Sequence, residues 1–111
     1  MMDKYEILMT TDAADDLIEL RDYIADVLLA PDTALAYIRT VREKIGTLSV
    51  LPERNKCVDE EPWRSRGIRK MMVKNFIVYY RIETSAKQIY ILNIIYAKRD
   101  QLRMLARMKN G

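Results

Sequence analysis

The residues best suited to take part in a chemical reaction in this sequence are basic, and they lie in the stretch 68–100. They are Arg69, Lys70, Lys74, Arg81, Lys98 and Arg99. Guanidinium groups can stabilise the charge of a pentavalent phosphate, and a lysine crowded by like charges has a lowered pKa that suits proton transfer. If the site cuts RNA without a metal ion, four of these residues are its catalytic candidates: Arg69, Lys70, Arg81 and Arg99.

The same part of the chain offers side chains for holding nucleic acid, namely Lys74, Tyr79, Lys98 and Arg103. Cations neutralise phosphates, and an aromatic ring can stack on a base. Alternation along a strand places Tyr79 and Arg81 on one face, where we expect Arg69 or Lys70 of the preceding strand to reach them. The alternative is that these are solvated side chains on the outer face of a half-exposed sheet.

Other kinds of site are excluded by composition. The sequence has no histidine and one cysteine, Cys57, which rules out imidazole catalysis and argues against a structural zinc site, and we expect no metal ion and no cofactor. A single cysteine cannot form an internal disulfide, which favours the reducing cytoplasm. No apolar run approaches the roughly 20 residues that span a bilayer, and no signal-peptide pattern is present. We therefore expect a cytoplasmic protein that does not contact membranes.

Charge is divided unevenly along the chain. Residues 1–62 contain 7 Lys/Arg and 14 Asp/Glu, a net charge of −7, whereas residues 63–111 contain 12 and 2, a net charge of +10; together they give the +3 of the whole chain. Such an imbalance indicates a basic face for nucleic acid or for an acidic partner. The alternative is that the two halves neutralise each other across the fold.

Three strands are predicted to position the basic residues, at 68–73, 76–83 and 88–97, because β-branched and aromatic residues are dense there. We expect tight turns at 74–75 and 84–87, with Asn75 taking the left-handed backbone. A further short strand is expected at 5–10.

Two amphipathic helices are expected between that first strand and the meander. Apolar residues recur at three-to-four spacing in both, with Thr11 and Asp12 capping the first helix, Pro31 breaking it and Asp32 capping the second. The apolar stripes predicted to be buried comprise Ala13, Leu17, Leu20, Ile24 and Val27 or Leu28, then Leu35, Ile38, Val41, Ile45 and Leu48.

The chain is thus expected to form one domain, residues 1–111, of the α+β class. Its order is β-α-α-β-β-β, with an antiparallel helix hairpin packed on a mainly antiparallel sheet and a short C-terminal helix or tail at 101–109. Residues 53–66 are expected to form a loop that anchors Trp63 against the helices.

The order of these elements, together with particular motifs, resembles the RelE/ParE superfamily of bacterial toxins from type II toxin–antitoxin systems. The motifs are Gly67-Ile68-Arg69, the run NFIVYYR at 75–81, and Lys98-Arg99-Asp100. The resemblance covers about residues 5–105. It implies a small cytoplasmic toxin that is held inactive by a cognate antitoxin, usually through an acidic, partly helical segment.

The resemblance implies two alternative targets. RelE-like toxins cut mRNA in the ribosomal A site with a cluster of Lys and Arg, whereas ParE-like toxins poison DNA gyrase and are not nucleases. Arg69, Lys70 and Arg99 match the first branch, and we expect a ribosome-dependent mRNA endonuclease on that basis. Ile77 stands where a catalytic arginine would fall and Leu105 where a tail tyrosine would fall, and the long helix hairpin is more similar to the ParE side. The gyrase inhibitor is therefore kept as the alternative, and an inactive remnant that binds only antitoxin as a third hypothesis.

Overall fold

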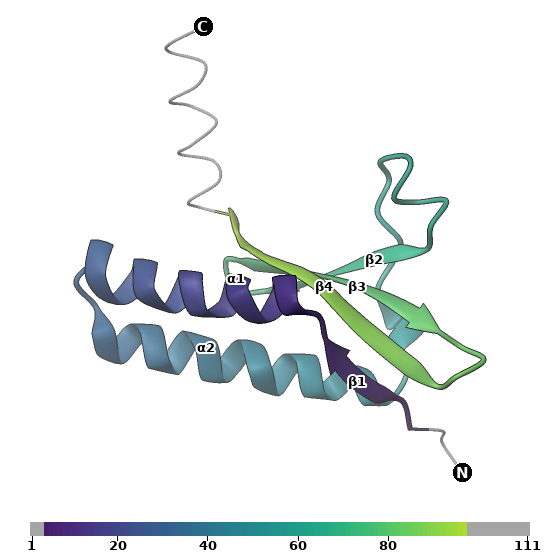
Figure 1. Cartoon of the computed structure of the whole chain (residues 1–111), viewed down its shortest axis with the longest axis horizontal. Coiled ribbons are helices and arrows are strands. Elements are labelled where there is room, and N and C mark those ends of the chain that lie inside the picture. The colour runs from purple at the N-terminus through teal and green to yellow at the C-terminus, as the bar shows by residue number, and fades with distance from the viewer. Residues whose placement is uncertain (1–3, 98–111) are drawn as a thin grey trace, which may run out of the picture.

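Four strands form one mixed sheet, and two helices cover one of its faces (Figure 1). The computed structural model describes residues 4–97 of the chain. The elements in chain order are β1 (Glu6–Met9), α1 (Thr11–Asp22), a π-helical turn (Tyr23–Val27), α2 (Pro31–Gly46), two 3₁₀ turns (Thr47–Ser49 and Pro52–Arg54), β2 (Ile68–Val73), β3 (Phe76–Glu83) and β4 (Gln88–Tyr96). This confirms the predicted α+β fold and its β-α-α-β-β-β order. The helix or tail expected at 101–109 lies outside the described residues.

The sheet has the strand order β1-β4-β3-β2. Strands β2, β3 and β4 form an antiparallel meander, and β1 lies parallel to β4. The turn between β2 and β3 has its left-handed residue at Lys74 (φ 55°) and not at Asn75, so that detail of the prediction is wrong. A positive φ at the first central residue is shared by the primed hairpin turns, whose twist matches that of the flanking strands.

Neither helix is capped by the predicted residues, because the N-cap of α1 is Thr10 and that of α2 is Ala30. Thr10 caps α1, because its hydroxyl accepts a hydrogen bond from the Ala13 amide at 3.2 Å. Pro31 is the first residue of α2 and does not simply break the preceding helix. The first helical position suits proline, because a backbone N–H there would have no intrahelical acceptor and proline has no N–H to leave unpaired. The preceding helix ends instead in the π-helical turn, followed by Leu29 with φ 52°.

The core lies between the helix hairpin and one face of the sheet. Its buried side chains come from every layer: Ala13, Leu17, Leu20, Ile24, Ala34, Val41, Ile45, Leu48, Met71, Val73, Phe76, Val78, Tyr80, Ile89, Ile91, Ile94 and Tyr96. Leu35 was predicted to be buried but is 58% exposed, and Val27 is 63% exposed. Val27 ends the π-helical turn and Leu35 lies near the start of α2, so both are close to the connection between the helices. Figure 1 shows this end of the hairpin extending past the sheet, and the described residues leave both side chains exposed.

The hydroxyl of Tyr80 ties the end of the helix layer to the sheet. It donates a hydrogen bond to the Pro52 carbonyl at 2.7 Å and accepts one from the Asn55 side-chain amide at 3.2 Å. The Tyr80 side chain is fully buried. Burial raises the pKa of Tyr80 above 10.0, because the phenolate would lose its hydration.

This geometry predicts how stability depends on pH. Above pH 10 an unfolded chain loses the Tyr80 proton while the folded chain keeps it, so the unfolded state binds fewer protons and the free energy of unfolding falls as pH rises. Tyr80→Phe is expected to cost about 1–2 kcal/mol at pH 7, since the Pro52 carbonyl loses its donor. The free energy of unfolding of Tyr80→Phe should also fall less steeply above pH 10 than that of the wild type. Urea unfolding of both proteins between pH 7 and 11 measures the difference, and parallel curves would contradict the assignment.

Candidate functional site

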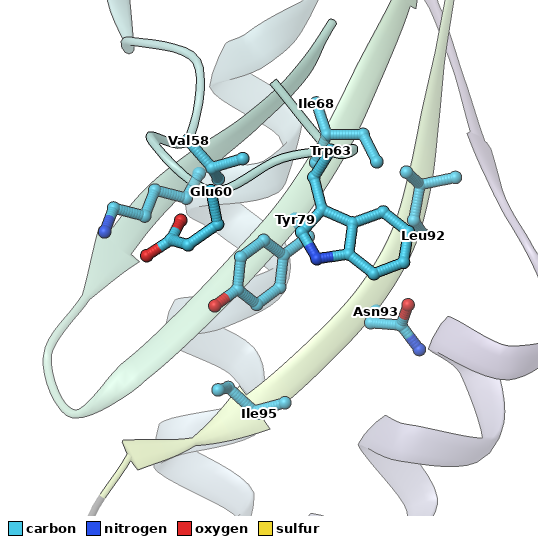
Figure 2. Close-up of a pocket in the computed structure, with 9 residues that line it drawn as sticks. Val58, Glu60, Trp63, Ile68, Tyr79, Leu92, Asn93 and Ile95 are labelled. Atoms are coloured by element: carbon cyan, nitrogen blue, oxygen red, sulfur yellow. The ribbon is translucent and has the colours of Figure 1, made fainter. Parts of the chain in front are cut away.

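A groove lies on the face of the sheet that points away from the helices, which we call the open face. Its cavity volume is about 410 Å³, within the range of small-ligand and side-chain pockets. It is lined by Val58, Glu60, Trp63, Ile68, Lys70, Tyr79, Leu92, Asn93 and Ile95 (Figure 2). Most of these side chains are apolar or aromatic, so the groove is suited to receive apolar groups.

Trp63 forms one wall of the groove. It belongs to the loop 59–67, here called the Trp63 loop, which rises on the side away from the helices (Figure 1). Figure 2 shows the indole lying across the open face between Tyr79 and Leu92. The prediction that Trp63 anchors the loop against the helices is therefore wrong. Its side chain is 46% exposed, a large aromatic surface left in contact with water.

A β-bulge in β4 turns an extra side chain into the groove. Tyr79 faces Asn93 while the next residue, Tyr80, faces Ile91, so Leu92 has no opposite residue. Two side chains from the start of the helix layer hold this irregularity. The Thr10 hydroxyl donates to the Ile91 carbonyl at 2.8 Å, and the Asp16 carboxylate accepts from the Ile94 amide at 2.9 Å. The bulge explains why Leu92 and its neighbour Asn93 both line the groove.

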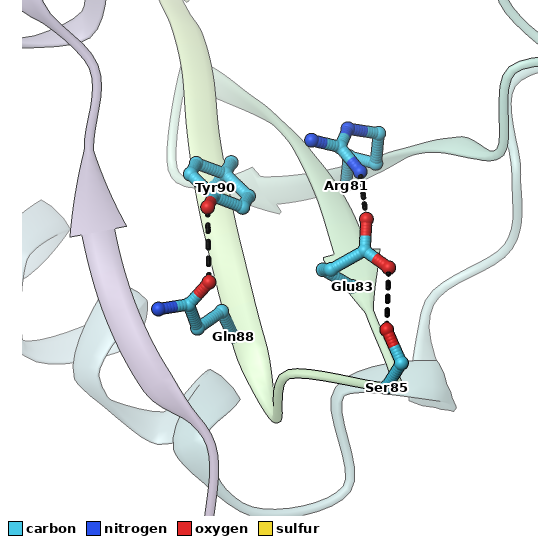
Figure 3. Close-up of polar contacts among 5 residues, drawn as sticks. All are labelled: Arg81, Glu83, Ser85, Gln88 and Tyr90. Atoms are coloured by element: carbon cyan, nitrogen blue, oxygen red, sulfur yellow. Dashed lines mark hydrogen bonds and ion pairs between the residues drawn. The ribbon is translucent and has the colours of Figure 1, made fainter.

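Two of the four catalytic candidates lie on the open face. Lys70 is exposed, lines the groove and faces Tyr79 across the strands. Arg81 lies further along β3 and forms an ion pair with Glu83 at 2.9 Å (Figure 3). Its guanidinium also stacks over the Tyr90 ring, 4.9 Å from the ring centroid. The hydrogen bond from Arg81 lowers the pKa of the exposed Glu83 carboxyl, because it stabilises the charged carboxylate.

Two further described candidates, Arg69 and Lys74, are not brought to this face. Arg69 shares the helix-side face with Met71 and Val73, so it does not meet Arg81 as expected. The Lys74 ammonium lies over the Tyr37 ring of α2, 5.2 Å from its centroid. Lys98, Arg99 and Arg103 lie outside the described residues. The catalytic and nucleic-acid roles of all these residues stay predictions.

Within residues 4–97, no group of three or more Cys, Asp and Glu side chains is arranged to hold a metal ion. In the same part of the chain, no helix is long and apolar enough to cross a membrane. The apolar wall residues were missed by the sequence reasoning, although one signal was present. Ile77 and Ile95 alternate with core residues, so they had to lie on the outer face and make it less polar than the cationic surface expected.

Comparison with known proteins gives a consistent result. The family model described as ParE toxin of type II toxin-antitoxin system, parDE, matches residues 7–101. The solved chromosomal ParDE toxin–antitoxin system from P. aeruginosa is similar with a TM-score of 0.68 and 25% identity, covering 84% of this chain and 96% of that chain. The toxin–antitoxin complex RelBE2 from Mycobacterium tuberculosis has a TM-score of 0.62 and 25% identity, covering 86% and 94%. No curated protein sequence matches the chain.

Proposed function

This chain belongs to the ParE toxin family of type II toxin–antitoxin systems, and from that premise we propose that it arrests growth by binding DNA gyrase. The observation that carries the proposal is the apolar, aromatic groove on the open face. A surface of this kind suits the side chains of a protein partner better than it suits phosphates, which need converging cations.

The arrangement of the basic residues supports binding over RNA cleavage. A metal-free nuclease has to stabilise a phosphorane with several positive charges and supply a proton donor and acceptor in one place. Among the described candidates, only Lys70 and Arg81 share the open face, and Arg81 is paired with Glu83. Arg69 lies on the other face.

A cognate antitoxin is the second partner in this proposal. The net charge of +10 in residues 63–111 would attract an acidic segment, and the groove would accept its apolar side chains. Both solved relatives come from toxin–antitoxin systems. We therefore propose that the antitoxin covers the open face and prevents the toxin from reaching its target.

The ribosome-dependent mRNA endonuclease is the second candidate function, and one observation favours it. Lys70 and Tyr79 are directly opposed on the open face, with Arg81 on the same side of β3. Lysine could act in proton transfer and tyrosine could stack on a base. Arg99, with Lys98 and Arg103, would have to complete such a site from beyond the described residues.

The two functions are separated by expressing the toxin briefly in bacteria without an antitoxin. Gyrase binding is expected to give DNA breaks, an SOS response and intact mRNA. The purified chain should also inhibit supercoiling by gyrase. New mRNA 5′ ends at a fixed position within translated codons would overturn the proposal in favour of the nuclease. Unimpaired growth would overturn both.

A matched variant sharpens this experiment. Arg81→Ala combined with Arg99→Ala removes two of the predicted charge stabilisers without altering the wall of the groove. If gyrase is the target, the double variant should remain toxic. If the chain cuts mRNA, the double variant should lose toxicity while keeping its binding to the antitoxin.

A further inference from the structure

Arg69 holds a segment of backbone that leads into the Trp63 loop. Its Nη1 donates hydrogen bonds to the Asn55 carbonyl at 2.6 Å and to the Glu53 carbonyl at 3.3 Å. The neighbouring side chain in the sheet, Tyr80, holds the Pro52 carbonyl of the same segment. Two side chains from adjacent strands thus fix three carbonyls within residues 52–55.

The segment then continues along the edge of β2. Cys57 forms a β-bridge with Arg69, the Val58 amide donates to the Ile68 carbonyl at 2.9 Å, and the Lys70 amide donates to the Lys56 carbonyl at 3.4 Å. Val58 is both the last residue before the Trp63 loop and a buried residue that lines the groove. Displacement of residues 52–58 would therefore displace the start of the loop.

The Trp63 loop is braced internally, so its orientation depends on its two ends. The Arg64 amide donates to the Glu60 carbonyl at 2.9 Å, the Gly67 amide to the Arg64 carbonyl at 3.0 Å, and the Ile68 amide to the Trp63 carbonyl at 3.1 Å. Gly67 has φ 75°, a conformation that glycine adopts without strain. These internal bonds make the loop a braced unit, so we expect release of one end to shift Trp63 together with its neighbours.

We propose that Arg69 is a positioning residue that holds the Trp63 loop over the open face and thereby shapes the groove. Arginine suits this task because its planar guanidinium presents several donors in fixed directions and can serve two carbonyls together. Its Nη1 donors are engaged with backbone, on the face opposite Lys70 and Arg81. The residue acts through Trp63 and not by touching the bound partner.

The test uses the full chain and the intrinsic fluorescence of Trp63, its single tryptophan. Arg69→Met removes the donors but keeps an unbranched apolar stem, and Arg42→Met is the control, because Arg42 is an exposed arginine of α2. Arg69→Met is expected to change the emission spectrum and acrylamide quenching of the toxin alone and to speed hydrogen exchange at the Val58 amide. Arg42→Met should change none of these. A residue that only contacted a partner would leave the spectrum of the unbound toxin unchanged, so a wild-type spectrum in Arg69→Met overturns the proposal.

Tyr80→Phe supplies a milder version of the same perturbation if Arg69→Met fails to fold. It frees the Pro52 carbonyl and the Asn55 side-chain amide but leaves both Arg69 hydrogen bonds in place, so it is expected to shift quenching in the same direction by a smaller amount. Unchanged quenching in that variant would also count against the proposal. The readouts need no antitoxin and no gyrase, so a failure here leaves the proposed function standing, and a failure of the proposed function leaves this role standing.

Discussion

Replacing Phe76 with alanine is expected to lower the free energy of unfolding by about 3–5 kcal/mol, the usual cost of deleting a large buried aromatic side chain. Phe76 is fully buried at the start of β3. Its ring stacks on Tyr96 with 5.0 Å between centroids and meets the Tyr37 ring edge-to-face at 6.0 Å. Because Tyr37 belongs to α2 and Tyr96 to β4, the substitution removes contacts between three elements. Small domains are stable by only about 5–15 kcal/mol, so the loss is a large part of the total.

The matched control is Met72→Ala in the adjacent strand. Met72 lies on the open face and is 58% exposed, so its truncation should change the free energy of unfolding by less than about 0.5 kcal/mol. Urea denaturation of the three proteins at pH 7 measures both effects. A loss below about 1 kcal/mol for Phe76→Ala would mean that the aromatic cluster repacks and does not join the helices to the sheet.

The meander and the helix hairpin were predictable because their signals are local. Density of β-branched residues marked the strands, and three-to-four spacing of apolar residues marked the helices. Exposure at Leu35 was not predictable in the same way. Its spacing matches the buried stripe, and only the length of the hairpin relative to the sheet decides that no surface covers it.

The candidate site was less predictable, since it depends on register and on distant contacts. Alternation already placed Arg69 with Met71 and Val73, so the sequence contained the signal that it could not share a face with Lys70. To predict that Leu92 lines the groove, one would have to know of a bulge that is held by Asp16, 76 residues earlier in the chain. No local pattern states on which side of a sheet a loop will lie, and for this reason Trp63 was assigned to the wrong side.

The contacts that the basic side chains make within the fold explain why apolar residues, and not basic ones, form most of the candidate site. A cation on a strand can be used to pair with a carboxylate, as Arg81 does with Glu83, or to hold backbone carbonyls, as Arg69 does. Neither use leaves the guanidinium fully available to a phosphate. The Trp63 indole has the Arg66 guanidinium 5.4 Å from its ring centroid, yet 46% of the residue stays exposed. Exposed aromatic surface of this kind is typical of protein-binding sites.

Trp63→Ala is accordingly expected to weaken antitoxin binding by about 2–4 kcal/mol, or roughly 30- to 1000-fold, the range found for a tryptophan at the centre of an interface. Trp63 is 46% exposed and lies outside the core, so the free energy of unfolding should change much less than for Phe76→Ala. The dissociation constant can be measured with the cognate antitoxin immobilised on a surface and the toxin variants in solution.

Leu29→Ala is the control for this experiment, because Leu29 is a large apolar residue that is 82% exposed but lies at the connection between the helices, away from the groove. If exposed apolar surface alone promotes binding, the two variants should lose similar affinity. If the groove is the docking site, only Trp63→Ala should lose it. Equal and small losses in both would place the antitoxin elsewhere on the toxin, and the open face would then remain available for gyrase even in the neutralised complex.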